Sequence, residues 1–199
     1  MAHRGPDGAG EWAEGALLIH RLLRVYHKET APGPYVSQCG RWVLSFNGEI
    51  YNFPELKEQW ARRLPPHFGR LNTDAEWLLE GWALLGPKVL DHTNGVFAFA
   101  LWDRAERKLV LGRDRLGEKP LYFTHQGEEF LFASEIKGLA AAGVKLRIDK
   151  SALADFLAYR YVPGPETLFL GVHKLLPGQL VTVDPDLRLH FRRYWTVEQ

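Results

Sequence analysis

The run GVFAFALWD, residues 95–103, restricts the possible folds more than any other stretch of the chain. It has the length of a strand and is apolar at both odd and even positions, so both faces of that strand must be covered. A second apolar run, KLVLGRD at 108–114, follows after only RAER, which is the spacing of an antiparallel hairpin. The sequence therefore predicts stacked layers rather than one sheet that is exposed to water.

Other runs extend this prediction along the chain. Further strands are expected at ALLIH (16–20), RWVLSFN (41–47), PLYF (120–123), FLFAS (130–134), GQLVTV (178–183) and LRLHFRRYW (187–195). Helices are expected at 53–64, where Leu56, Trp60 and Leu64 share a face, from Thr73 onward, at 135–142 and at 151–160. We therefore predict an α+β fold in which most strands are antiparallel.

Composition excludes several classes of protein. Charges are balanced, with a net charge of +1, so there is no global field to hold a nucleic-acid backbone. A single cysteine excludes an intramolecular disulfide, which favours a cytoplasmic protein. No apolar run has the length of a membrane span, and no His, Cys or Asp cluster has metal-ligand spacing. We therefore expect no nucleic-acid partner, no membrane partner and no bound metal.

Two short motifs carry residues suited to chemistry. In FNGEIYNF, the pair Asn47-Gly48 is typical of a two-residue hairpin turn. The same pair could instead present a backbone N–H and a side-chain amide as two donors for an oxyanion. Both interpretations stay open from the residues alone. In TDAE, Thr73 and Glu76 have capping-box spacing, which places Asp74 in the first turn of a helix, where the helix dipole favours a carboxylate.

Six motifs in order, HRGPDG, FNGEIYNF, TDAE, GVFAFALWD, GRDRLGEKPLYF and FASEIKGL, resemble the glutaminase domain of asparagine synthetase, a class II glutamine amidotransferase. The similarity runs from His3 to about Trp195. It implies an N-terminal-nucleophile hydrolase sandwich, with α/β/β/α layers and antiparallel sheets. It also implies one amidotransferase domain over 1–199 that lacks the family's first strand and the synthetase domain.

The resemblance also implies residue roles. Asn47 and Gly48 match the oxyanion hole, Glu49 continues the same glutamine-contacting loop, and Asp74 matches the carboxylate that receives the α-ammonium of glutamine. The α-carboxylate is held by an arginine in HRLLRV, where Arg21 is preferred as a bidentate partner and Arg24 is the second choice. Leu22 and Val25 complete the expected glutamine-binding set.

Two further motifs are expected to be architectural. HRGPDG resembles a loop that is ordered near the active site through His3, Arg4 and Asp7. In GRDRLGEKPLYF, Asp114 and Arg115 are expected to organise a turn between strands, with no part in catalysis.

Family members use an N-terminal cysteine whose free α-amine, with a pKa of about 8, can act as the base. Cys39 is internal, so we expect it to be a small structural residue and not the nucleophile. The expected function is the glutaminase half of an asparagine synthetase, which supplies ammonia for ATP-dependent amidation of aspartate and is inactive as this fragment. The alternative is a non-catalytic glutamine-binding or regulatory module.

The expected partners follow from the same resemblance. They are L-glutamine, a synthetase domain and a second copy in a homodimer. No cofactor is expected in this domain, whereas ATP and Mg²⁺ are implied for the synthetase domain.

Overall fold

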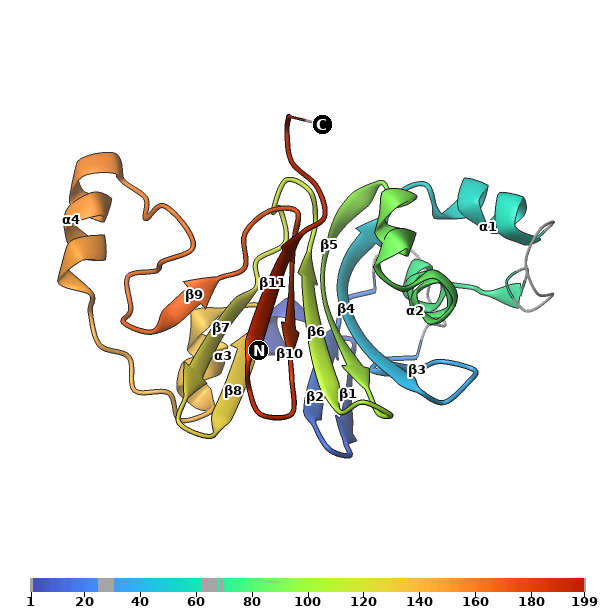
Figure 1. Cartoon of the computed structure of the whole chain (residues 1–199), viewed down its shortest axis with the longest axis horizontal. Coiled ribbons are helices and arrows are strands. Elements are labelled where there is room, and N and C mark those ends of the chain that lie inside the picture. Colours follow the sequence, from blue (N-terminus) through green and yellow to red (C-terminus); the bar gives the residue numbers. More distant parts are fainter. Residues whose placement is uncertain (1, 25–30, 62–67, 69, 199) are drawn as a thin grey trace.

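A computed structural model describes residues 2–24, 31–61, 68 and 70–198 (Figure 1). Eleven strands are assigned in these segments: β1 (Gly8–Ala13), β2 (Leu17–Leu22), β3 (Tyr35–Val36), β4 (Trp42–Ile50), β5 (Gly95–Asp103), β6 (Lys108–Arg113), β7 (Tyr122–Gln126), β8 (Glu129–Ala133), β9 (Val172–Lys174), β10 (Gln179–Val183) and β11 (Leu189–Arg193). The α-helices there are α1 (Phe53–Ala61), α2 (Asp74–Leu85), α3 (Ile136–Ala141) and α4 (Lys150–Tyr159). The predicted α+β class is therefore confirmed.

The centre of the fold is a six-stranded sheet in the order β11-β10-β6-β5-β4-β3, in which the described neighbours are antiparallel. Alternate residues of β5 enter two different cores. Phe97, Phe99 and Leu101 pack in the cluster that includes α1 and α2. Ala98, Ala100 and Trp102 pack in a second cluster, against the smaller sheets. The expectation that GVFAFALWD is buried on both faces is therefore confirmed.

The second layer consists of two small sheets, β1-β2 and β8-β7-β9. Side chains of the three-stranded sheet alternate as the pleat requires. Phe123 and Phe132 face the large sheet, whereas Tyr122 and Leu131 pack on the other side, against the cluster that includes Leu139 of α3. The layers therefore run helix, sheet, sheet, helix.

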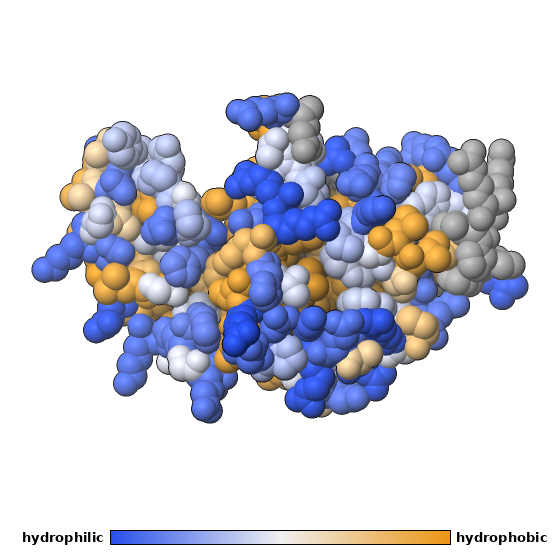
Figure 2. All heavy atoms as spheres, viewed as in Figure 1, coloured by the Kyte–Doolittle hydropathy of each residue, from blue (hydrophilic) through white to orange (hydrophobic). Residues whose placement is uncertain are grey.

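Two segments outside the large sheet, β2 and α4, expose apolar side chains. Leu17 and Ile19 lie on the outer face of β2 and are 61% and 64% exposed, while Leu18 between them is buried. In α4, Ala152 is the buried residue, and Figure 2 shows hydrophobic atoms over this helix, where Leu157 is 64% exposed.

Three short strands have no signal in the sequence that we recognised. In β1, GAGEWA has neither an apolar run nor β-branched residues, and β3 and β9 have only two and three residues. These strands form because neighbouring strands supply hydrogen-bonding partners, as β2 does for all six residues of β1. The predicted helix at 53–64 is observed to residue 61, and Leu64 lies outside the described residues.

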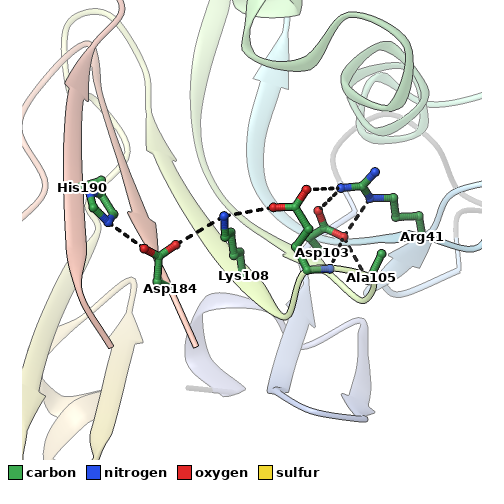
Figure 3. Close-up of polar contacts among 7 residues, drawn as sticks. Arg41, Asp103, Ala105, Lys108, Asp184 and His190 are labelled. Carbon is green, nitrogen blue, oxygen red and sulfur yellow. Dashed lines mark hydrogen bonds and ion pairs between the residues drawn. The ribbon is translucent and has the colours of Figure 1, made fainter. Parts of the chain in front are cut away.

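Charged side chains connect neighbouring strands of the large sheet at one end of those strands (Figure 3). Arg41 Nε donates to Asp103 Oδ1 at 2.8 Å. Further ion pairs continue across the sheet through Glu106, Lys108, Asp184 and His190. In the register of β4 and β5, Trp42 pairs with Asp103 at this end of the two strands, and Ile50 pairs with Gly95 at their opposite end. The candidate site lies at that opposite end.

Candidate functional site

Asn47 and Gly48 lie within β4 and not in a turn, because this strand continues to Ile50 and pairs with β5 throughout. The interpretation of Asn-Gly as a hairpin turn is therefore wrong. A Cβ at Gly48 would lie 2.1 Å from the carbonyl oxygen of Val96, and one at Gly95 would lie 2.2 Å from that of Glu49. The two glycines thus allow β4 and β5 to approach closely. Gly48 is exposed and Asn47 is half-buried, so this backbone is accessible to a ligand.

Asp74 is fixed at the start of α2 by the predicted capping box. Thr73 Oγ1 accepts from Glu76 N, and Glu76 Oε2 accepts from Thr73 N, both at 3.1 Å. The Asp74 carboxylate accepts from Ile50 N at 2.8 Å and from its neighbour Ala75 N at 2.9 Å. The helix start is therefore tied directly to the end of the strand that carries Asn47, Gly48 and Glu49.

The environment of Asp74 favours a nearby cation. Burial raises the pKa of this carboxyl above its usual value, the Glu49 carboxylate raises it further, and the backbone hydrogen bonds from Ile50 and Ala75 oppose the rise. Each carboxylate oxygen accepts one backbone N–H and keeps a lone pair for a further donor. An ammonium group placed here would stabilise the ionised form.

The predicted carboxylate anchor lies at the end of β2. Arg21 Nε donates to the carbonyl oxygen of Gly5 at 3.0 Å. Among the described residues, neither Nη group of Arg21 has a hydrogen-bond partner. Leu22 is half-buried, and the second choice, Arg24, is exposed and donates its backbone N–H to Asp7 at 2.8 Å. Val25 lies outside the described residues.

Two rings that we did not predict, the buried His20 of β2 and the half-buried Tyr35 of β3, lie between β2, β4 and the start of α2. His20 Nδ1 lies 3.3 Å from Ser45 Oγ on β4, and its ring makes an edge contact with Tyr35 at 6.3 Å. Burial lowers the pKa of His20. Burial, Asp74 and Glu76 raise the pKa of the Tyr35 phenol, so this ring lies within the field of the start of α2. A polar residue inside the apolar run ALLIH was the signal for His20.

These contacts bring the expected residues to one region. Asn47, Gly48, Glu49 and Asp74 are linked through Ile50, and His20, the neighbour of Arg21 in β2, contacts Ser45 of β4. Clefts of about 330 Å³ and 170 Å³ flank this region without including Asn47 or Asp74. The larger is lined in part by Tyr35, Glu76 and Glu80 of β3 and α2.

Cys39 lies far from these residues. It is exposed in the turn before β4, with its Sγ 3.2 Å from Ser37 Oγ. The five residue steps from Trp42 to Asn47 along β4 alone span about 17 Å. The described residues contain no group of three His, Cys, Asp or Glu side chains that could hold a metal ion. In the same segments no helix is both long and apolar enough to cross a bilayer.

Known proteins resemble this chain over much of its length. Asparagine synthetase [glutamine-hydrolyzing] 3 of Bacillus subtilis is 34% identical over 203 residues, which covers 100% of this chain and 33% of that protein. Asparagine synthetase B [glutamine-hydrolyzing] of Escherichia coli is 38% identical over 141 residues, or 70% of this chain and 25% of that protein. The chain thus spans about a third or less of the length of these relatives.

A solved structure shows the fold independently. Glutamine phosphoribosylpyrophosphate amidotransferase from B. subtilis superimposes with a TM-score of 0.67 at 18% identity, over 97% of this chain and 44% of that chain. This likeness confirms the N-terminal-nucleophile hydrolase sandwich that the sequence motifs implied. The family described as glutamine amidotransferase domain matches residues 1–195. On that match, over almost the whole sequence, the chain belongs to the glutamine amidotransferase domain family.

Proposed function

We propose that the chain is the glutaminase part of a glutamine-hydrolysing asparagine synthetase. It binds L-glutamine, and hydrolysis of the side-chain amide supplies ammonia to a synthetase domain, which uses ATP and Mg²⁺ to amidate aspartate. The observation that carries the proposal is the hydrogen bond from Ile50 N to Asp74, because it joins an ammonium-binding carboxylate to the strand that carries Asn47 and Gly48. The relatives named asparagine synthetase support the choice of acceptor domain.

Each end of glutamine has a partner in this proposal. Asp74 binds the α-ammonium, and Arg21 binds the α-carboxylate in a bidentate contact. Leu22 and Glu49 complete the contacts around the substrate. At the amide end, the backbone N–H of Gly48 and the side-chain amide of Asn47 stabilise the oxyanion that forms when a nucleophile attacks the carbonyl carbon.

The nucleophile of this reaction is not Cys39. A thiol nucleophile of this type needs a base, and in this class the base is the α-amine of the same cysteine. The α-nitrogen of Cys39 is in a peptide bond, and its thiol lies beyond the other end of β4. Glutamine turnover therefore requires a cysteine that these 199 residues do not supply, whereas glutamine binding does not require one.

The test measures binding and turnover separately. Isothermal titration of the purified chain with glutamine is expected to show saturable binding that Asp74→Asn weakens. Ammonia release is expected only from a version fused behind a strand that begins with cysteine, as in a full-length relative. Absence of glutamine binding in both versions would refute the proposal. Ammonia release by the chain itself that Cys39→Ser abolishes would show that Cys39 is the nucleophile.

A second candidate is a glutamine-binding or regulatory module without catalysis, and the remote position of Cys39 favours it. Both candidates predict glutamine binding. They differ in the complete gene product, which releases ammonia from glutamine only if the first candidate is correct.

A further inference from the structure

We propose that Glu135 is a positioning residue for Arg21, and that it acts through the turn formed by residues 2–7. This inference rests on the proposed role of Arg21 as the anchor for the α-carboxylate of glutamine. Glu135 belongs to the motif FASEIKGL, which the sequence singled out but to which the proposed reaction gives no task.

Glu135 occupies the N-cap position of α3 and has extended backbone angles, with φ −143° and ψ 142°. A side chain at this position usually accepts a hydrogen bond from its own helix, but that of Glu135 does not. Its carboxylate instead accepts from His3 Nε2 at 3.1 Å and from Arg4 Nη1 at 3.1 Å. A residue placed to cap a helix thus binds a segment more than 130 residues away in the sequence.

The same segment contacts the end of β2. The carbonyl oxygen of Gly5, the residue after Arg4, accepts from Arg21 Nε at 3.0 Å. A Cβ at Gly5 would lie 2.5 Å from the carbonyl carbon of Arg21, so the turn lies directly against this strand. Asp7 adds two bonds, from its N–H to Leu22 O at 3.0 Å and from Arg24 N to its carboxylate at 2.8 Å.

The direction of the Arg21 guanidinium therefore depends on where the Gly5 carbonyl lies. Asp7 fixes the C-terminal end of the turn, and Glu135 fixes its N-terminal end through His3 and Arg4. Release of the N-terminal end would leave Arg21 Nε without a fixed acceptor, while the backbone of β2 would stay paired with β1.

Charge makes Glu135 a strong acceptor at neutral pH. Hydrogen bonds from Lys137, His3 and Arg4 lower the pKa of this carboxyl to about 2, with Lys137 as the largest cause. Lys137 Nζ lies 3.0 Å from Glu135 Oε2, its side chain is 63% exposed, and it belongs to α3 rather than to the turn. Lys137 therefore provides a matched control that changes the charge of the cluster without breaking its link to the turn.

Among the partners of Glu135, His3 is exposed and Arg4 is half-exposed, and ion pairs open to solvent contribute little to overall stability. Glu135→Gln is therefore expected to leave the melting temperature nearly unchanged. Its effect falls on Arg21, which can be observed directly as the Nε–H signal in ¹⁵N NMR spectra, assigned by its loss in Arg21→Met.

The experiment compares wild type, Glu135→Gln, Arg4→Met and the control Lys137→Gln. We expect hydrogen exchange of the Arg21 Nε–H to accelerate about tenfold or more in the first two variants, because the acceptor is no longer held, and to stay unchanged in the control. An unchanged Arg21 signal in both Glu135→Gln and Arg4→Met overturns the proposal, whatever the protein does with glutamine.

Glutamine titrations then separate this proposal from the proposed function. Glu135→Gln is expected to raise the Kd about tenfold in the presence of Arg21 and to have no effect in the Arg21→Met background, because a positioning residue acts only through the group it positions. Equal effects in both backgrounds overturn the positioning role. If wild type binds no glutamine, the proposed function fails, and the Arg21 signal still decides whether Glu135 positions this side chain.

Discussion

Replacement of Asp74 by asparagine separates the binding role of this carboxylate from its structural role. Asparagine has the same shape, so one oxygen can still accept a backbone N–H, either from Ile50 or from Ala75. Loss of the other bond costs about 1 kcal/mol. Removal of a charge that burial disfavours offsets this loss, because burial is the main reason that the pKa of Asp74 is raised. We expect the free energy of unfolding at neutral pH to change by less than about 1 kcal/mol.

Glutamine binding should change much more than stability. A charge-assisted hydrogen bond between Asp74 and the α-ammonium contributes about 1.5–3 kcal/mol, which corresponds to a rise in Kd of roughly 10- to 100-fold in Asp74→Asn. Isothermal titration gives the Kd, and urea unfolding gives the stability. Asp91→Asn, at an exposed aspartate, is the control and should change neither. An unchanged Kd in Asp74→Asn would refute the ammonium contact, and a loss of several kcal/mol in stability would make Asp74 mainly structural.

The raised pKa of Asp74 adds a pH dependence with a fixed sign. The native state takes up the proton at a higher pH than the unfolded chain does, so this group makes folding more favourable as pH falls through the raised pKa toward the ordinary 3.8. Wild type should therefore gain stability relative to Asp74→Asn over that interval. Over the same interval wild type should lose glutamine affinity, because the protonated carboxyl no longer pairs with the ammonium.

Three other changes test the fold around the site. Gly48→Ala should lower the free energy of unfolding by about 1–3 kcal/mol in urea, because its Cβ would lie 2.1 Å from a backbone oxygen that no side-chain rotation can move. An unchanged free energy of unfolding would contradict the close approach of β4 and β5. Asp114 is buried and accepts four backbone N–H groups, including that of Phe97, so Asp114→Ala should cost about 3–5 kcal/mol in the same assay and Asp114→Asn about half as much. Equal losses of stability in the two Asp114 variants would contradict this reasoning, because the remaining amide oxygen of asparagine should keep part of these hydrogen bonds. The double variant Leu17→Thr/Ile19→Thr should reduce self-association in sedimentation velocity, because both side chains are exposed on the outer face of β2; a wild-type chain that stays monomeric at high concentration would contradict it.

Much of the fold could be predicted because its signals are local. The apolar run at 95–103 showed a strand buried on both faces, and the spacing of Thr73 and Glu76 showed where α2 begins. The turn at Asp114 was also expected, since acidic residues accept backbone N–H groups in turns. In each case the residues that decide the structure lie within a few positions of one another. The six motifs, taken together, also predicted the sandwich and the family.

The tertiary structure decided the features that depend on distant partners. Asn47-Gly48 has the local signal of a turn, but it is extended because β5 pairs with it and because Gly95 leaves room for the close approach. β1 has no strand signal and is defined by its pairing with β2. Glu135 has the local position of a helix cap, yet it binds His3 and Arg4. The sequence by itself determined which segments form strands and helices with a buried face. Only the assembled layers decided which polar groups meet, because those groups are brought together by packing and not by spacing along the chain.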